Sequence, residues 1–339
     1  MSAGDLLGGL AVPVVQAPMA GATTPAMAAA ATEAGGLGFL AAGYRTASGL
    51  AEDIAAVRAR TTGAFGVNVF VPGRDTGDPA AVAAYADRLR GDAERLGAGL
   101  GDPVWRDDAW DAKLALLRRD PVPVVTFTFG CPSGDVLAGL RGSGSTVGVT
   151  VTTPDEARAA EDAGAEFLCV QGAESGGHQG SFSDAAERTV PLLDLLAAVR
   201  AATPLPLVAA GAIMTGADVA RVCAAGAVAA QCGTAFLRTP ESAAKPAHQA
   251  ALTDPAYAET AVTRVFSGRR ARGLVNTFMR DHSEAAPAAY PQIHYLTSPL
   301  RAAAAKSGNA NALNLWAGTA HTQARAIPTT AVMATLANT

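Results

Sequence analysis

The chain has 339 residues, of which 49% are hydrophobic and 17% charged, which is typical of a folded protein with a large core and excludes an intrinsically disordered one. Its formal net charge of −4 provides no basic field for a phosphate backbone, so we expect no nucleic acid partner. The four cysteines are dispersed without a CxxC pair, so we expect neither a metal site nor a disulfide framework, and the cytoplasm is the simplest location.

The amino-terminal segment contains no charged residue from Leu6 to Thr32, which is long enough for a membrane span. Prolines and polar residues interrupt it, however, and no basic segment precedes it. We therefore expect neither a transmembrane helix nor a signal peptide.

Short apolar runs alternate with longer segments of helical character along most of the chain. Eight such units predict an α/β fold of the TIM (β/α)8 barrel type, with a long open parallel sheet as the alternative. The strands are expected at Val12–Ala17, Gly38–Ala41, Gly66–Val69, Val122–Phe127, Thr146–Val151, Phe167–Gln171, Leu205–Ala210 and Ala227–Gln231. Helices are expected to begin after the capping residues Thr24, Thr46, Thr153 and Thr215 and to end at Ala-Gly pairs such as 34–35, 163–164 and 225–226.

Two stretches break this alternation. Residues 72–119 separate the third strand from the fourth, and residues 240–308 follow the eighth. Both leave the barrel at carboxyl-terminal strand ends, where barrels of this type have their active sites. We expect the two stretches to form a mainly helical lid or substrate-binding domain over a barrel made of residues 1–71, 120–239 and 309–330.

The loops after the seventh and eighth strands give the clearest chemical signal. In each, a strand runs into glycine, Gly211 or Gly233, and then into the start of a helix. Such loops present bare backbone N–H groups, and this position is the usual phosphate site of the barrel. The alternative is that both glycines only permit tight turns.

The loop after the sixth strand carries a candidate catalytic residue. Gly176 and Gly177 allow the backbone to approach a planar ligand closely, and His178 would then project into the barrel mouth, where proton transfer is useful. A histidine at this position could instead cap the loop.

Further candidates surround the same mouth. Ala17 and Met19 follow the first strand and could lie against a ring. Asn68 could form hydrogen bonds with the polar edge of a flavin or purine, or it could form a turn. Thr126 and Thr128 could point into the mouth or pack. Three arginines could bind an anionic substrate or be solvated: Arg269, Arg270 and Arg272. The other histidines are expected at the surface or in the cleft wall: His248, His282, His294 and His321.

Several motifs together resemble the nitronate monooxygenases, formerly called 2-nitropropane dioxygenases. The Gly-Gly-His loop and the Gly-Thr-Ala-Phe block after the eighth strand are the more specific ones, and the resemblance spans most of the chain. The motifs are Gln-Ala-Pro-Met-Ala-Gly at 16–21, Gly-Val-Asn-Val-Phe at 66–70, Val-Thr-Phe-Thr-Phe-Gly at 125–130, Gln-Gly-Ala-Glu-Ser-Gly-Gly-His at 171–178 and Leu-Trp-Ala-Gly at 315–318.

The resemblance implies that FMN is the cofactor and that His178 is the catalytic histidine beside it. It implies FMN contacts at Ala17, Met19, Asn68, Gln171, Gly176, Gly177 and Ala210, a phosphate site at Gly211, Gly233 and Thr234, and a segment from Trp316 to Gly318 that returns to the barrel mouth. The chain departs from the family pattern at Thr126, where some members have lysine, at Ala212, where a second glycine is common, and at Thr319, where glutamine is frequent.

The implied activity is the oxidation of small alkyl nitronates with O2 to carbonyl compounds and nitrite. If a neutral nitroalkane is also a substrate, His178 would remove the proton next to the nitro group. One alternative is an NAD(P)H-dependent FMN reductase that acts on quinones or enoyl thioesters. Another is a non-catalytic flavin-binding protein, against which the intact histidine loop argues. The sequence leaves both a monomer and a homodimer open.

Overall fold

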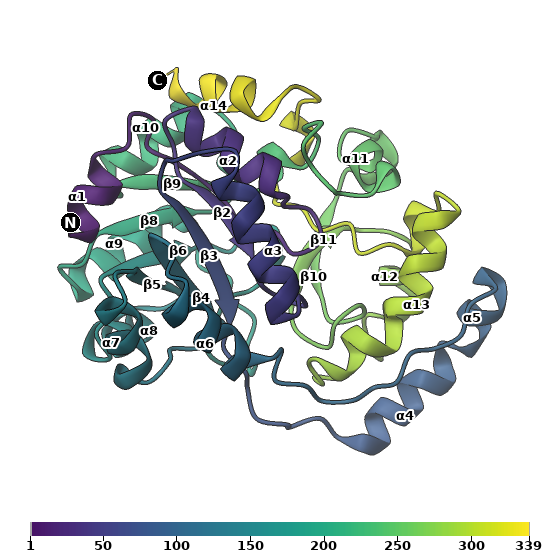
Figure 1. The fold of residues 1–339 in the computed structure, drawn as a ribbon. Helices are drawn as coiled ribbons and strands as arrows, with labels where there is room; N and C mark the ends of the chain where they lie inside the picture. The colour runs from purple at the N-terminus through teal and green to yellow at the C-terminus, as the bar shows by residue number, and fades with distance from the viewer. Residues whose placement is uncertain (1, 339) are drawn as a thin grey trace.

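The computed structural model of the protein describes residues 2–338, so the first residue of the predicted barrel range, Met1, lies outside the described part. All eight predicted strands are present and parallel (Figure 1). They are β1 (Val14–Gln16), β2 (Gly38–Ala41), β3 (Phe65–Phe70), β4 (Val124–Thr128), β5 (Thr146–Val151), β6 (Phe167–Gln171), β8 (Leu207–Ala210) and β9 (Ala229–Cys232).

These strands form a barrel and not an open sheet. Their order is β1-β9-β8-β6-β5-β4-β3-β2, and a parallel bridge between Val15 and Leu37 connects the two end strands. The Gln16 amide donates to the Leu37 carbonyl at 2.9 Å across this seam. The predicted TIM barrel is therefore confirmed, and the open-sheet alternative is wrong.

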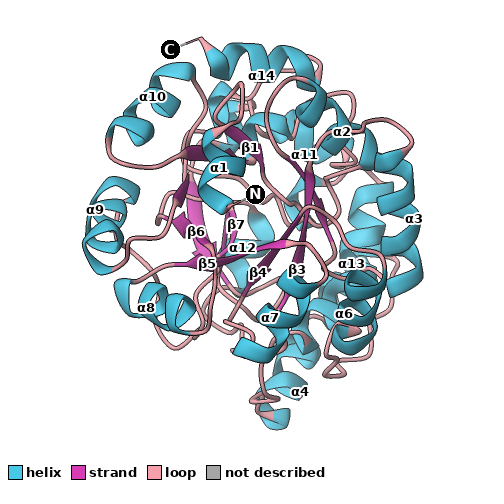
Figure 2. Ribbon diagram, turned by 60° about the vertical axis from the view of Figure 1, so that its left-hand side comes forward, coloured by secondary structure: helices cyan, strands magenta, loops and turns pink. Residues whose placement is uncertain are grey.

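An outer ring of helices surrounds the barrel (Figure 2). The ring consists of α2 (Pro25–Glu33), α3 (Ala47–Arg58), α6 (Trp110–Arg119), α7 (Gly134–Gly142), α8 (Pro154–Asp162), α9 (Leu192–Ala202), α10 (Gly216–Ala224) and α14 (Thr329–Ala337). Helix α6 packs against α3 and α7, and α14 packs between α10 and α2. Among the helices of residues 2–338, none has both the length and the apolar character needed to cross a membrane.

The predicted helix boundaries are confirmed by their capping geometry. Each capping threonine accepts a hydrogen bond from the amide three residues further on, at Thr24, Thr46, Thr153 and Thr215. The glycines of the three Ala-Gly pairs all have the left-handed backbone that ends a helix: Gly35, Gly164 and Gly226. Local sequence therefore determines where the barrel helices begin and end.

The amino-terminal end of the barrel is sealed by α1 (Ala3–Gly8), which lies across it in Figure 2. Its Ala3 and Leu7 belong to a buried cluster with strand residues such as Phe39 and Phe167. The barrel interior can therefore accept a ligand only from the carboxyl-terminal end of the strands.

The two insertions lie at that carboxyl-terminal end and contribute both helices and a small sheet. Helix α13 (Gln292–Lys306) packs against α4 (Pro79–Arg88) and α5 (Arg90–Leu96), which extend away from the barrel in Figure 1. The second insertion also contains α11 (Pro246–Ala251), α12 (Thr277–His282) and the strands β10 (Thr260–Thr263) and β11 (Ala271–Leu274), which form an antiparallel sheet with β7 (Gly177–His178) from the loop after β6. The sequence did not predict this sheet, and the division into barrel and lid stays a proposal.

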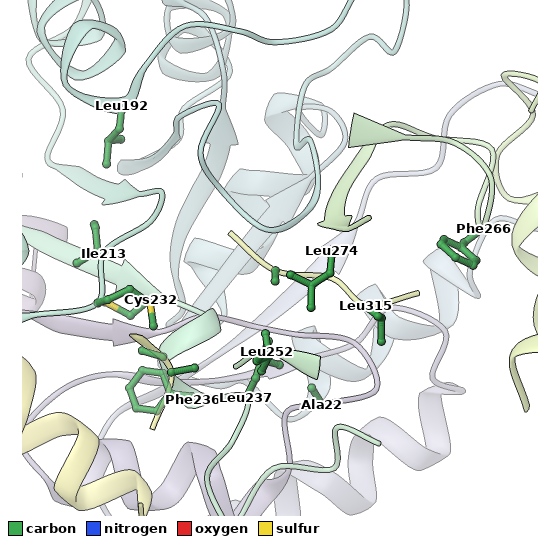
Figure 3. Packing of buried hydrophobic residues seen from close by; sticks show 14 of the residues in the cluster. Ala22, Leu192, Ile213, Cys232, Phe236, Leu237, Leu252, Phe266, Leu274 and Leu315 are labelled. Carbon is green, nitrogen blue, oxygen red and sulfur yellow. The ribbon is translucent and has the colours of Figure 1, made fainter. Parts of the chain in front are cut away.

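The loops after β8 and β9 rest on a well-packed apolar layer (Figure 3). Ile213, Cys232 and Phe236 from this part of the barrel belong to the same buried cluster as Leu252 and Leu274 from the second insertion. Because interiors of this kind are close-packed, the loop backbones above them are held in place.

Candidate active site

A single cavity of about 560 Å³ lies at the carboxyl ends of all eight barrel strands, a size suited to a small-molecule ligand. The cationic side chains in its wall are Arg45, Lys245 and Arg301, and the wall also contains the histidines His178, His248 and His294. Within residues 2–338, no aspartate or glutamate contributes to this wall. In a protein with a net charge of −4, this arrangement favours anionic ligands.

Unpartnered backbone amides line the cavity where β8 and β9 end. The amides of Gly211, Ala212 and Ile213 after β8, and those of Gly233 and Thr234 after β9, donate to no acceptor within residues 2–338. Bare N–H groups that converge on a cavity from two neighbouring loops form a suitable seat for a ligand rich in acceptor oxygens. A phosphate group supplies such oxygens.

The glycines of this region serve different purposes. A Cβ at Gly176 would lie 2.4 Å from the Ala317 carbonyl carbon, so this glycine permits contact between two chain segments. Gly177 has a φ of +75° and faces open space, which leaves its backbone accessible to a ligand. Gly318 does not line the cavity, and its amide donates to Oγ1 of the wall residue Thr234 at 3.0 Å.

His178 is placed in the wall by the small antiparallel sheet, in which it pairs with Ala271. Its Nε2 atom lies 2.8 Å from Ser267 Oγ, and that hydroxyl also lies 3.1 Å from the Arg269 carbonyl, to which it can donate. Because a hydroxyl has one hydrogen, this network assigns the proton of the neutral imidazole to Nε2. The basic lone pair of His178 is then on Nδ1.

Aromatic side chains surround the imidazole. The ring centroids of Phe129, Tyr290 and Trp316 lie 5.5, 5.8 and 5.7 Å from that of His178. Burial in this environment, reinforced by the charges of Arg269 and Arg301, lowers the pKa of His178 to about 3. His178 is therefore neutral near pH 7, with one unprotonated ring nitrogen.

Two polar strand residues are oriented by their neighbours. Asn68 Oδ1 accepts hydrogen bonds from the hydroxyls of Thr126 and Thr128, each at 3.0 Å, so its Nδ2 amide is left as a donor for a ligand. Asn68 lies inside β3, so the turn-forming alternative is wrong. The Gln171 side chain bonds the His178 carbonyl and the Gly180 amide and thereby fixes the loop between them.

Comparison with known proteins agrees with this geometry. A family model described as nitronate monooxygenase matches residues 6–338. The chain belongs to the nitronate monooxygenase family. A nitronate monooxygenase of Pseudomonas aeruginosa is 39% identical over 97% of this chain and 96% of its own length. The structure of nitroalkane oxidase from Streptomyces ansochromogenes is 54% identical, with a TM-score of 0.95 over 98% of this chain and 96% of its own.

A more distant structural relative is FabK from Thermotoga maritima, with 26% identity and a TM-score of 0.76 over 99% of this chain and 94% of its own. The resemblance inferred from the sequence motifs is thus confirmed at the level of the family. As a nitronate monooxygenase family member, the protein is a flavin-dependent oxidoreductase.

The structure brings most of the predicted site residues of this nitronate monooxygenase family member to one cavity. Its wall includes Ala17, Met19, Asn68, Gln171, Gly176, Gly177, His178, Ala210, Gly211, Gly233, Thr234 and Trp316. Of the thirteen predicted residues, only Gly318 lies outside the wall. Their contacts with a flavin stay a prediction.

The three candidate arginines and two of the histidines differ from expectation. Arg269, Arg270 and Arg272 line no part of this cavity; Arg269 is buried over the Phe129 ring, with its guanidinium carbon 4.1 Å from the ring centroid, and so is not solvated. His282 and His321 are buried and bonded to Asp92 and the Leu252 carbonyl, so their predicted surface or cleft-wall positions are wrong. Sequence reasoning missed Ser267 and Arg301, which line the cavity.

The cavity histidines predict a pH dependence of stability. Burial lowers the pKa of His178 to about 3 and that of His248 to about 4, whereas both take up protons near pH 6.5 when unfolded. The unfolded chain then binds more protons below that pH, so stability is lost as the pH falls from about 6.5 toward 4. We expect the free energy of unfolding to be roughly 2–4 kcal/mol lower at about pH 5 than at about pH 7.

Urea unfolding at the two pH values measures this difference. The His248→Gln variant retains a donor for the Trp316 carbonyl but does not titrate, so its pH dependence should be shallower. An equal loss in the variant and the wild type would remove His248 as a source of the effect.

Proposed function

We propose that this protein binds FMN and oxidises small alkyl nitronates with O2 to carbonyl compounds and nitrite. The observation that carries the proposal is a cavity in which, among residues 2–338, five backbone amides lack a partner and three cations but no carboxylate line the wall. Such a cavity suits two anions, the phosphate of a cofactor and the nitronate of a substrate. Membership of the nitronate monooxygenase family supports the same reading.

The residues fit FMN. The amides after β8 and β9 would hold its phosphate, and Asn68 Nδ2 would donate to a polar edge of its ring. Ala17 and Met19 line the same cavity next to Gly233 and supply apolar surface. When bound, FMN supplies the redox chemistry, because it can accept electrons from the nitronate and pass them to O2.

The protein side chains then provide orientation and proton transfer. For a neutral nitroalkane, the Nδ1 lone pair of His178 would take the proton from the carbon next to the nitro group, while Ser267 keeps the imidazole in the required tautomer. The rings of Phe129, Tyr290 and Trp316 limit the water around that base. A nitronate is already deprotonated and needs only to be bound and oriented.

The purified protein is expected to contain non-covalent FMN. The reason is that the five unpartnered amides after β8 and β9 form one seat for a phosphate group. Chromatography of the cofactor released by heat identifies it. Release of FAD or a sugar phosphate, or failure to bind FMN on reconstitution, would contradict this part of the proposal.

Anaerobic mixing with a nitronate, and separately with NADH, tests the activity. Bleaching of the flavin by the nitronate, followed by nitrite formation when O2 is admitted, is the expected result. Bleaching by NADH alone would indicate a reductase of quinones or enoyl thioesters instead. Bleaching by neither would indicate a non-catalytic flavin-binding protein.

A further inference from the structure

Arg301 is a cation in the cavity wall without an acidic partner. It lies on α13, and none of the ion pairs within residues 2–338 includes it. Burial lowers its pKa to about 10, so the guanidinium is still charged near pH 7. A charge held out of bulk water without a counter-ion is costly, and an anionic ligand would offset that cost.

The Arg301 guanidinium is held in one orientation by its own helix. Its Nε donates to Thr297 Oγ1 at 3.1 Å, and its Nη2 donates to Ser298 Oγ and to the His294 carbonyl, each at 2.8 Å. The remaining group, Nη1, has no acceptor within residues 2–338. Because the group is fixed before any ligand arrives, a bond to Nη1 costs little ordering entropy.

His294 extends the same donor surface. Its Nδ1 lies 3.3 Å from the positively charged Arg301 Nη2, a position that favours an unprotonated Nδ1 and therefore places the proton of the neutral ring on Nε2. The ring is stacked on Tyr44, with centroids 3.8 Å apart and planes within 5°. The phenol of Tyr44 in turn accepts from the Tyr290 hydroxyl at 3.0 Å. Because the Tyr290 ring also packs against His178, this bond fixes the stacked rings of His294 and Tyr44 close to His178.

We propose that Arg301, assisted by His294, binds the negatively charged oxygens of the nitronate and thereby selects anionic substrates over neutral ones. This inference rests on the proposed function. A guanidinium donates to a nitronate oxygen through a charge-assisted hydrogen bond, whereas the oxygens of a neutral nitroalkane carry less charge. The amides proposed to hold the FMN phosphate lie on the loops after β8 and β9. Arg301 and His294 lie on α13, next to Tyr44 from the loop after β2. The phosphate and the nitronate therefore have separate donors.

Nitrate is a suitable probe, because it is a planar anion with the same oxygen geometry as a nitronate and is not oxidised. It is titrated into FMN-loaded wild type, Arg301→Met and Arg301→Lys while the flavin absorption spectrum or the heat of binding is followed. The Kd of nitrate is expected to rise about 10-fold or more in Arg301→Met, and less in Arg301→Lys, which keeps the charge. The KM for a nitronate should rise by a similar factor, and the KM for the corresponding neutral nitroalkane should change much less.

The control variant is Arg238→Met, which removes another half-buried arginine whose guanidinium bonds the Ala324 carbonyl outside the cavity. Its nitrate Kd should equal that of the wild type. If Arg301→Met does not fold, Arg301→Lys and Arg301→Gln provide the same comparison.

Equal nitrate affinity in wild type and the Arg301 variants would overturn the inference, as would a loss of FMN affinity with no change toward nitrate. A wild-type protein that binds nitrate but does not oxidise any nitronate would instead overturn the proposed function, so the two failures are distinguishable.

Discussion

The His178→Asn variant is expected to keep its FMN and to lose activity on neutral nitroalkanes by roughly 100-fold or more, the scale of a positioned proton-transfer group. Asparagine keeps similar size and can still donate to Ser267, but it cannot accept a proton near neutral pH. Oxidation of a preformed nitronate should suffer much less, because its carbon is already deprotonated. Steady-state rates on the two forms of one compound provide the measurement.

A matched variant separates this effect from general destabilisation. His282→Asn also removes a buried histidine, but one that bonds Asp92 outside the cavity, so its activity on both substrates should be close to the wild-type value. If His178→Asn retains full activity on both substrates, His178 has no role in the mechanism. Equal large losses on both would make it an anion-binding residue and not a base.

The pH profile of the wild type offers a second readout of the same group. Because burial lowers the pKa of His178 to about 3, the imidazole stays unprotonated through the neutral and mildly acidic range. Activity on neutral nitroalkanes should therefore not fall at about pH 6.5, where an exposed histidine would become protonated.

The barrel could be predicted from sequence because its signals are local. A capping threonine, a first-turn acidic residue and a final glycine all act within one helix, and Thr215 with Asp218 forms both bonds of a capping box as its spacing indicates. The strands are buried on both faces and read as continuous apolar runs. Such features do not depend on what lies elsewhere in the chain.

The arrangement around His178 could not be predicted in the same way, because it depends on distant segments. Ser267, which sets the histidine tautomer, is 89 residues away in the chain, and β11, which pairs with the histidine, has only four residues. Arg301 had one local signal, since Thr297 and His294 precede it by four and seven residues on the same helix face. That spacing does not reveal which face meets the cavity.

Backbone strain is a further feature that the residue types conceal. Phe129 has a φ of +79° directly after β4, and its ring lies next to both His178 and Arg269. A bulky residue in this conformation costs about 1–3 kcal/mol and persists only where its surroundings hold it. Ala212, one of the residues whose amides are proposed to hold the phosphate, has a φ of +50°. Glycine adopts such a positive φ most easily, and glycine is common in the family at that position.

The Gly233→Asp variant is expected to lose FMN while it keeps the barrel fold. A φ of −112° means that a side chain is tolerated by the backbone, and its Cβ would lie 3.4 Å from Ala17 Cβ and from Met19 Sδ. The carboxylate would then stand beside the amides proposed to hold the phosphate, and two anions in a site that excludes water repel strongly. Gly211→Asp is a less clean test, because a φ of +149° adds backbone strain.

The Gly233→Asn variant separates the effect of the charge from that of the side-chain size, because asparagine has nearly the same shape as aspartate but no charge. If the amides after β9 hold the phosphate, Gly233→Asp should weaken FMN binding by roughly 100-fold, equivalent to a repulsion of about 3 kcal/mol, and Gly233→Asn by clearly less. Cofactor occupancy after dialysis, with circular dichroism to verify the fold, measures both. Equal losses of FMN binding would mean that the added side chain blocks the flavin ring between Ala17 and Met19. Unchanged FMN occupancy in both variants would place the phosphate away from β9, with the amides of Gly211, Ala212 and Ile213 as the remaining donors.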